Sequence, residues 1–415
     1  MKTNIKNILL QVSLCLLFLF FSQNTIAQKT ENRIAVFAPI FLDSAFNGNT
    51  FKIWENSLPK NMLPGLEFFN GIQMAIDSLQ KEGINNLIVD IYDYKSKGNS
   101  LLEIVKNTKN KLSTSTIIIA SFNKYTDIKI LADFANKNKI PLISASFPNE
   151  GGVNNNPYFF LLNPTIQTHV NAIYKNLVAN YKQTNIVYIK CKGAFENWVD
   201  NSFIEFEENT SIDKRVILKP ITFSDSFTSK ELFINLDSNF QNTIVCNCSK
   251  EVFAQKVIKE LSSHTNYNTT VLGLPTWDSY NISDGVNYKD VPVIHTSAYN
   301  FSNLNYNIEN VIKAYENQYY LKPSDQFFKG FETMLRVGKT VSLYHENAIT
   351  LFSDNLFRVF NELIIQPHYN KVLNTQVDYF ENTKIYHIKK LNGQIVGSHP
   401  KIYPSLGRDG NEVGR

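Results

Sequence analysis

The chain has 415 residues, of which 43% are hydrophobic and 13% are aromatic, so it has enough apolar side chains for one oversized core or two ordinary ones. Its 41 lysines and arginines nearly balance its 37 aspartates and glutamates. A nucleic-acid-binding protein usually carries a marked basic excess, so we expect no nucleic-acid partner.

The first 27 residues have the layout of a secretory signal peptide. A basic start precedes an apolar run over residues 8–21, and the Thr-Ile-Ala sequence at 25–27 supplies a cleavage site. The alternative is a membrane anchor, but the apolar run is shorter than the ~20 residues that a spanning helix needs. We therefore expect cleavage after Ala27, export of the remaining chain to the periplasm or the outside of the cell, and no membrane-spanning segment.

Between residues 33 and 146, apolar runs of β type alternate with segments of helical period. The runs are continuously apolar, which is typical of strands buried on both faces of a parallel sheet. The sequence therefore predicts a doubly wound α/β lobe. The expected strands are 33–40, 86–93, 116–121 and 140–146, and the expected helices are 66–83, 99–112 and 126–138.

The same alternation of apolar runs and helical segments resumes after residue 165, which predicts a second α/β lobe of similar size. Two further helical stretches follow, and then a tail with turn signals at Glu381-Asn382 and Asn392-Gly393 that predicts a hairpin. The expected strands are 185–191, 216–223, 243–248 and 269–274, and the expected helices are 166–181, 197–209, 250–263, 307–321 and 324–345, with one more starting at Ser229.

Six stretches, taken in order, carry a family resemblance: KTENRIAVFAPI, FFNGIQMAIDSL, IPLISASFPN, NPYFFLLNPT, AYENQYYLKPSDQFFKGFETM and YFENTKIYHIKKLNGQ. In this order and spacing, the chain resembles the type I periplasmic binding proteins, the leucine/isoleucine/valine-binding group and its receptor ligand-binding relatives. The resemblance implies an α/β fold of two doubly wound parallel-sheet lobes joined by a three-strand hinge. It assigns residues 28–163 and 299–365 to lobe 1 and residues 164–298 and 366–415 to lobe 2.

One segment departs from the family pattern early in the chain. Residues 41–65 are longer than the turn that the family has between its first strand and first helix, and they carry Trp54. Two interpretations stay open at this point. The segment caps the cleft or contacts a partner at its mouth, or it is simply a packed loop.

In the amino-acid-binding relatives, loops after two strands of lobe 1 supply hydroxyl and backbone groups to the ligand, at the sheet edge where open α/β folds bind ligands. The first loop here replaces the family's small hydroxyl residues with Asn123-Lys124-Tyr125, which weakens the expectation of an amino-acid ligand. The same residue types also cap helices and turns, so a structural role stays open. The contacts implied by the resemblance are Asn123, Tyr125, Thr126, Ser144, Ser146 and Phe147.

In lobe 2, the relatives use aromatic and acidic residues to close over the ligand and to meet its amine. The Tyr-Gly turn that is common in the first of these loops is missing here. For Trp198, packing within the lobe and stacking on a ligand both stay open. The implied counterparts are Phe195, Glu196, Trp198, Asn247, Trp277 and Asp278.

Three cysteines follow the predicted signal peptide: Cys191, Cys246 and Cys248. A bridge between Cys246 and Cys248 would be badly strained, because residues two apart on a strand point to the same face. In the strand order that the resemblance implies, the strand ending at Cys191 lies beside the strand that carries the other two. We expect a disulfide from Cys191 to Cys248 or to Cys246 in an oxidising compartment. No histidine stands at metal-ligand spacing nearby, so we expect no metal site.

Motifs of common enzyme classes are incomplete in this sequence. Gly338-Lys339-Thr340 ends like a phosphate-binding loop, but Thr333 stands where that loop needs a glycine. His345 begins a sequence like that of zinc proteases, but Ile349 stands where the second histidine is needed. The sequence has neither a Gly-x-Ser-x-Gly elbow nor a glycine-rich dinucleotide fingerprint. We expect no enzymatic activity and no cofactor.

Two functional hypotheses fit these features. The first is an exported solute-binding protein that closes its lobes around a small polar, amino-acid-like ligand and delivers it to a transporter or sensor. The second keeps the fold without the ligand: a cell-envelope interaction protein that contacts an envelope enzyme, similar to the activators of peptidoglycan synthases. The altered loop at Asn123 and the long segment 41–65 favour the second, while the Ser144 to Ser146 loop favours the first.

Overall fold

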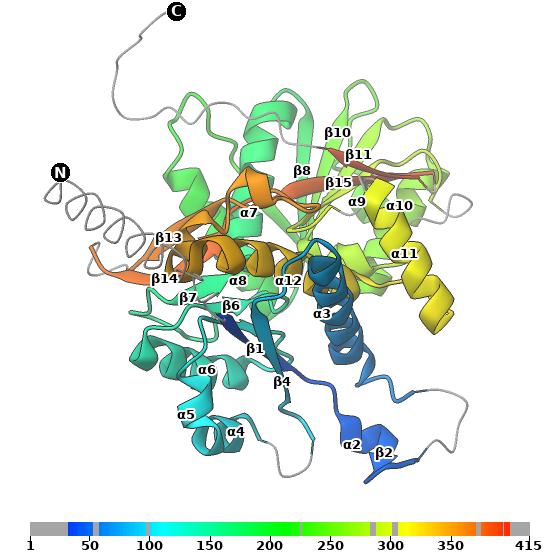
Figure 1. The fold of residues 1–415 in the computed structure, drawn as a ribbon. Coiled ribbons are helices and arrows are strands. Elements are labelled where there is room, and N and C mark those ends of the chain that lie inside the picture. The colour runs from blue at the N-terminus through cyan, green and yellow to red at the C-terminus, as the bar shows by residue number, and fades with distance from the viewer. Residues whose placement is uncertain are drawn as a thin grey trace, which may run out of the picture.

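The computed structural model of the chain describes residues 32–52, 58–96, 100–224, 226–282, 288–300, 306–370, 375–392 and 394–398. The predicted signal peptide and Trp54 lie outside the described residues. Two seven-stranded sheets form the cores of two lobes, so the predicted fold class is confirmed. In Figure 1 the blue and cyan elements of lobe 1 lie below the green elements of lobe 2. Among the described residues, no helix combines the length and the apolar character needed to cross a bilayer.

The sheet of lobe 1 has the strand order β13-β14-β7-β6-β5-β1-β4. Strands β4, β1, β5, β6, β7 and β14 run parallel, and β13 pairs antiparallel with β14 at the edge. The strands are β1 (Asn32–Ala38), β4 (Leu87–Asp93), β5 (Ile117–Ala120), β6 (Leu142–Ser144), β7 (Phe159–Leu161), β13 (Ile365–Tyr369) and β14 (Val377–Asn382).

Helices cover both faces of this sheet, which explains why its strands are continuously apolar. Ile34 and Val36 of β1 pack into one core, while Ala35 and Phe37 pack into the core on the opposite face. The first core is closed by α3 (Leu63–Lys81), α11 (Tyr306–Tyr319) and α12 (Asp325–Tyr344), and the second by α4 (Leu101–Asn107), α5 (Lys109–Leu112) and α6 (Tyr125–Asn138).

Helices α3 and α12 approach each other so closely that only glycine fits at their crossing. A Cβ atom on Gly71 would lie 2.1 Å from the carbonyl oxygen of Phe327, and one on Gly330 would lie 2.2 Å from that of Phe68. Both obstacles are backbone atoms, so the helices themselves would have to move apart.

Gly330→Ala is therefore expected to lower the free energy of unfolding by about 3 kcal/mol, because overpacking a tight core outweighs the better helix propensity of alanine. Urea denaturation followed by circular dichroism measures the loss. Leu343→Ala is the control, because Leu343 is an exposed residue of the same helix and surface changes usually stay within about 0.5 kcal/mol. Equal unfolding free energies for the Gly330 variant and the wild type would contradict the close crossing.

The sheet of lobe 2 has the order β16-β15-β12-β11-β10-β8-β9, with β15 and β16 antiparallel at one edge. Its strands are β8 (Asn185–Cys191), β9 (Pro220–Phe223), β10 (Asn242–Asn247), β11 (Thr269–Gly273), β12 (Val293–Ser297), β15 (Tyr386–Leu391) and β16 (Gln394–Ser398). Its helices are α7 (Ile166–Asn176), which continues as the π-helical turn η1 (Leu177–Tyr181), α8 (Ala194–Glu208), α9 (Ser229–Phe233), α10 (Glu251–Ser263) and the 3-10 turn η2 (Pro275–Ser279).

The tail of the chain corrects the expected boundary between the lobes. Residues 366–382 were expected in lobe 2, but β13 and β14 belong to the sheet of lobe 1. The physical reason is the pairing of β14 with β7, in which Phe380 stacks on Phe160 with ring centroids 5.0 Å apart. The turn signal at Glu381-Asn382 therefore marks a crossing between lobes rather than a hairpin, whereas β15 and β16 do form a hairpin.

The chain crosses between the sheets three times: from β7 to α7, from β12 to α11, and from β14 to β15. Buried Asn382 joins two of these crossings, because its amide donates to the carbonyl oxygen of Leu162 at 3.1 Å and its side-chain oxygen accepts from the backbone N–H of Lys384 at 3.1 Å. Glu381 caps α7 by accepting hydrogen bonds from the backbone and hydroxyl of Thr165. These contacts hold the crossings between the two lobes in place.

The described part of the long segment after β1 is folded. It forms α2 (Leu42–Ala45) and a small hairpin of β2 (Phe46–Asn47) and β3 (Thr50–Phe51). Asp93 holds its start, because the carboxylate accepts hydrogen bonds from the backbone N–H groups of Ile40, Phe41 and Leu42 at 2.9–3.1 Å. In Figure 1 this hairpin projects from lobe 1, away from the elements of lobe 2.

Candidate functional site: a cavity between the lobes

A cavity of about 700 Å³ lies beside the hinge and is lined by both lobes. Lobe 1 contributes the loop after β6 and the first turns of α12, while lobe 2 contributes α7, the start of α8, η2, β12 and the edge strands β15 and β16. This size suits a small molecule. Its aromatic and aliphatic lining includes Phe195, Trp198, Tyr299, Ile166, Ile388 and Ile395.

Lys329 is the cationic group of this cavity. It lies on α12, one turn after Asp325, and its ammonium sits 4.7 Å from the centre of the Tyr299 ring. Burial lowers the pKa of Lys329, while the charges of Asp325 and Asp278 act in the opposite direction. Within the part of the chain that the structure describes, the ammonium has no hydrogen-bonding or ion-pair partner. The amine of Lys329 therefore lies in the cavity beside an aromatic ring, and no other described residue uses its donors.

Asp278 is the acidic group that faces the cavity from lobe 2. One carboxylate oxygen, Oδ1, lies 3.0 Å from Nε2 of His295, and 46% of the side chain stays exposed. The ammonium of Lys390 donates to the carbonyl oxygens of Trp277 and Asp278 at 3.3 and 3.1 Å. Burial alone would raise the pKa of Asp278, but the His295 contact and the nearby lysines outweigh it and hold that pKa below its usual range. Asp278 is thus a carboxylate at neutral pH.

Three buried histidines from distant parts of the chain gather at this wall, and His169 lines the cavity itself. The sequence did not reveal this cluster. Its members are His169 on α7, His295 on β12 and His387 on β15. Burial lowers the pKa of His169 to about 3 and that of His387 to about 4, and the histidines lower one another's values further. Among the described residues, no group of three or more His, Cys, Asp or Glu side chains is arranged to hold a metal ion.

The predicted contacts of lobe 1 are not among the residues that line the cavity. The groups after β6 are bonded within the protein: the Ser146 hydroxyl lies 2.8 Å from that of Ser121, and the Tyr299 hydroxyl donates to the carbonyl oxygen of Ala145 at 2.7 Å. The Asn163 amide likewise donates to the carbonyl oxygen of Ser146 at 2.8 Å. The hydroxyls and carbonyls that the resemblance implied for a ligand therefore stabilise the turn itself.

The remaining predicted residues of lobe 1 are spread over different environments. Ser144 is fully buried, and its hydroxyl has no partner among the described residues. Phe147 packs partly buried against the core under α6. The side chains of Asn123, Tyr125 and Thr126 are exposed around the start of α6.

In lobe 2 the structure brings Phe195 and Trp198 together at the cavity, with ring centroids 6.4 Å apart. Asn247 and Trp277, by contrast, are fully buried and bonded internally. The Asn247 amide donates to the carbonyl oxygen of Glu196 at 2.8 Å, and the Trp277 indole donates to the carbonyl oxygen of Cys248 at 3.1 Å. These two residues support the loops beneath the cavity rather than line it.

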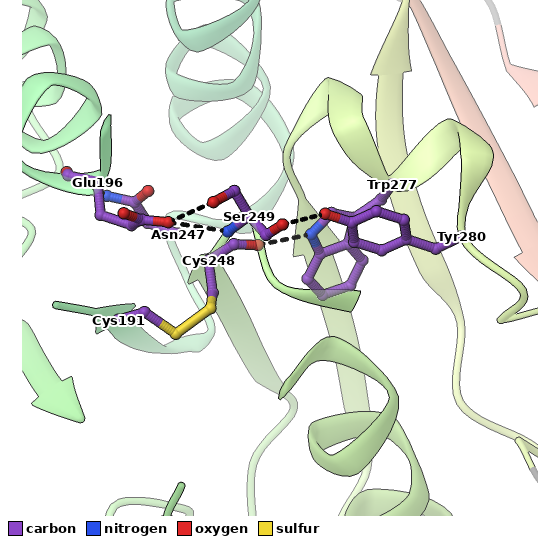
Figure 2. Close-up of a disulfide and its surroundings, with 7 residues drawn as sticks. All are labelled: Cys191, Glu196, Asn247, Cys248, Ser249, Trp277 and Tyr280. Carbon is purple, nitrogen blue, oxygen red and sulfur yellow. Dashed lines mark hydrogen bonds between the residues drawn. A yellow bond between two sulfur atoms is a disulfide. The ribbon is translucent and has the colours of Figure 1, made fainter. Parts of the chain in front are cut away.

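A disulfide joins Cys191 at the end of β8 to Cys248 after β10, and Cys246 stays a buried thiol. Figure 2 shows Cys248 bridged to Cys191 on one side, while on the other side its carbonyl oxygen accepts a hydrogen bond from the Trp277 indole. The next residue, Ser249, donates its hydroxyl and backbone N–H to Glu196 at 2.6 and 3.0 Å. The bridge thus anchors the loops that carry Glu196 and Trp277 in one cluster.

Comparison with protein-family models yields no match, and no curated protein matches the sequence. Solved structures do match. An ABC transporter substrate-binding protein from Desulfitobacterium hafniense is 12% identical with a TM-score of 0.57, covering 89% of this chain and 100% of its own. Such a protein in complex with Leu, also from Desulfitobacterium hafniense, is 12% identical with a TM-score of 0.52, covering 89% and 100%.

A branched chain amino acid ABC transporter periplasmic ligand-binding protein from Burkholderia xenovorans is similar as well. It is 10% identical with a TM-score of 0.56, and the match covers 88% of this chain and 91% of that protein. At these identities the likeness concerns the fold. The two seven-stranded sheets, the three crossings and these matches together show that the chain has the type I periplasmic binding protein fold.

Proposed function

We propose that this protein is an exported solute-binding protein whose lobes close around a small polar ligand and deliver it to a transporter or sensor. The observation that carries the proposal is the pair of opposite charges in the cavity. Lys329 belongs to lobe 1 and Asp278 to lobe 2, and both line the same space. A ligand that contacts both groups would favour the closed arrangement, as in hinge closure of other binding proteins.

The chemistry of the lining supports an amino-acid-like ligand. An ammonium with free donors suits a carboxylate, and an ionised carboxylate suits an amine, because charge-assisted hydrogen bonds are the strong ones. Phe195 and Trp198 offer apolar surface beside these two groups. Such a ligand would be held at the hinge side of the cleft rather than at the β6 turn, where the Ser146 hydroxyl and the Ala145 carbonyl are already bonded.

The envelope interaction protein is the second candidate. Its support is the small hairpin after β1, where Phe46 and Phe51 pair with ring centroids 5.3 Å apart while both stay exposed, next to exposed Leu42. No residue of this hairpin lines the cavity. An exposed apolar patch away from the ligand cleft is typical of a surface that contacts another protein.

A thermal-shift screen of the mature protein against amino acids, peptides, sugars and cell-wall fragments tests the first candidate. A ligand at 100 times its Kd is expected to stabilise the protein by about 2.7 kcal/mol. Lys329→Met should weaken binding of that ligand at least tenfold, equivalent to about 1.4 kcal/mol, as measured by calorimetry. Lys322→Met is the matched control, because Lys322 is exposed and lies outside the cavity.

One result would speak against this function, and another would speak against the proposed site. If no compound shifts the melting temperature while the protein captures an envelope enzyme through the hairpin, the second candidate replaces the first. If a ligand binds equally well to the Lys329 variant and to the wild type, the solute-binding function stands but the cavity beside Lys329 is not where the ligand sits.

A further inference from the structure

His295 is buried directly behind the acidic group of the cavity. Its side chain is fully buried on β12, and Nε2 lies 3.0 Å from Oδ1 of Asp278. Burial lowers the pKa of His295 despite the opposing effect of Asp278, so the imidazole is neutral at neutral pH and carries one N–H. Nδ1 has no hydrogen-bonding partner among the described residues. The hydrogen therefore belongs on Nε2, where it is donated to Asp278.

The rest of the turn that carries Asp278 is also held from within lobe 2. Lys390 on β15 binds the carbonyl oxygens of Trp277 and Asp278. The Trp277 ring is fully buried and bonded to the backbone of Cys248. The backbone of Asp278 is thus fixed, Asp278 lines the cavity, and the His295 contact uses Oδ1 but leaves the second oxygen, Oδ2, unused.

We propose that His295 is a positioning residue, which orients the Asp278 carboxylate toward the cavity so that Oδ2 accepts a hydrogen bond from a cationic N–H group of the ligand. This inference rests on the proposed function for its ligand, but the orientation of Asp278 is a property of the protein alone. An unsupported aspartate on a surface turn would sample several rotamers, and fixing one of them before binding reduces the entropy lost on binding.

Other charged groups also act on this carboxylate and must be separated from His295. Lys390 and Lys329 lower the pKa of Asp278 together with His295. His169 on α7 and His387 on β15 are the other titratable groups of the histidine cluster, and Asp325 is the other acid of the cavity. A useful variant therefore changes His295 while it leaves these groups in place.

Carbon-13 NMR of protein labelled at the aspartate carboxyl carbons tests the inference, with Asp278→Asn to assign the signal. In the wild type, Asp278 should titrate below the usual value of about 3.9. His295→Leu removes the donor but keeps the buried volume, so the pKa of Asp278 should rise by about one unit or more, since burial is then less opposed. His295→Gln offers an N–H in place of Nε2–H and should restore the low value.

His387→Leu is the matched control, because it places the same leucine in the same buried cluster. The low pKa of Asp278 should persist in this variant, while a crystal structure of the His295→Leu protein should show the Asp278 carboxylate rotated from its wild-type direction. Identical Asp278 titrations in the wild type and His295→Leu, or equal shifts in His295→Leu and His387→Leu, would overturn the inference. Because this titration needs no ligand, it decides the role of His295 even if the ligand screen contradicts the proposed function.

Discussion

Removal of the Cys191–Cys248 disulfide is expected to lower the free energy of unfolding of lobe 2 by about 4 kcal/mol. The two cysteines are 57 residues apart in the sequence. A bridge that closes a loop of this length lowers the conformational entropy of the unfolded chain, which destabilises the unfolded state by about 4 kcal/mol. The comparison is made by urea denaturation of the Cys191→Ala/Cys248→Ala double variant and of the oxidised wild type.

Cys246 provides the matched control for this experiment. It is buried in the same region but is not bridged, so Cys246→Ala should cost far less, and its unfolding should still respond to reductant. The double variant should not respond, because it has no bridge to reduce. If dithiothreitol leaves the unfolding of the wild type unchanged, the bridge does not stabilise the folded protein.

The bridge also matters for the cavity. Cys248 accepts the hydrogen bond of the Trp277 indole, and Asp278 follows Trp277 directly in the sequence. Loss of the bridge would loosen the turn that carries the carboxylate as well as the loop of Phe195 and Trp198. A variant without the bridge should therefore bind the small polar ligand that we propose more weakly, even at temperatures where it stays folded.

The fold could be predicted from the sequence because it depends on local signals. A strand buried on both faces must be continuously apolar, and the run that became β5 shows this, with all four residues of Ile117–Ala120 buried. The boundary at β14 was missed because a turn signal does not say whether the chain reverses or continues into another sheet. Only the pairing of β14 with β7, more than 200 residues earlier, decides that.

The cavity was harder to predict, since the resemblance implied Asp278 but no motif marks Lys329 or Asp325, which also line it. Lys329 follows Asp325 by one helical turn, a spacing that on a sequence looks like an ordinary surface pair. The resemblance implied ligand contacts at the β6 turn. There, however, the Tyr299 hydroxyl and the Asn163 amide donate hydrogen bonds to backbone carbonyl oxygens. Phe195 and Trp198, which the resemblance implied, lie at the start of the helix after β8, and both line the cavity.

The histidine cluster could not be derived from spacing at all. His169, His295 and His387 lie on α7, β12 and β15, and the antiparallel pairing of β12 with β15 brings two of these elements together. In the sequence they were three of seven scattered histidines. All three are buried in the uncharged form, and this makes the stability of lobe 2 depend on pH.

Lobe 2 is expected to lose about 5 kcal/mol of stability between pH 7.5 and pH 4.5. The unfolded chain binds protons at its histidines below about pH 6.5, whereas folded His169 and His387 resist protonation down to pKa values of about 3 and about 4. Stability is thus fully present above pH 6.5 and falls with pH by about 1.4 kcal/mol per unit for each histidine that stays neutral. Urea denaturation at successive pH values, followed by tryptophan fluorescence, measures this slope.

His169→Gln and His387→Asn should each reduce the slope by about 1.4 kcal/mol per pH unit, which corresponds to one bound proton, since neither replacement titrates in this range. His264→Asn is the control, because His264 is only partly buried and outside the cluster, so the slope should stay as in the wild type. An unfolding free energy that is constant from pH 6.5 to pH 4.5 would contradict the buried neutral cluster.

The neutral state of the cluster also matters for the cavity. Protonating His169 or His387 would place a cation beside His295, and this cation would compete for the Asp278 carboxylate that we assign to the ligand.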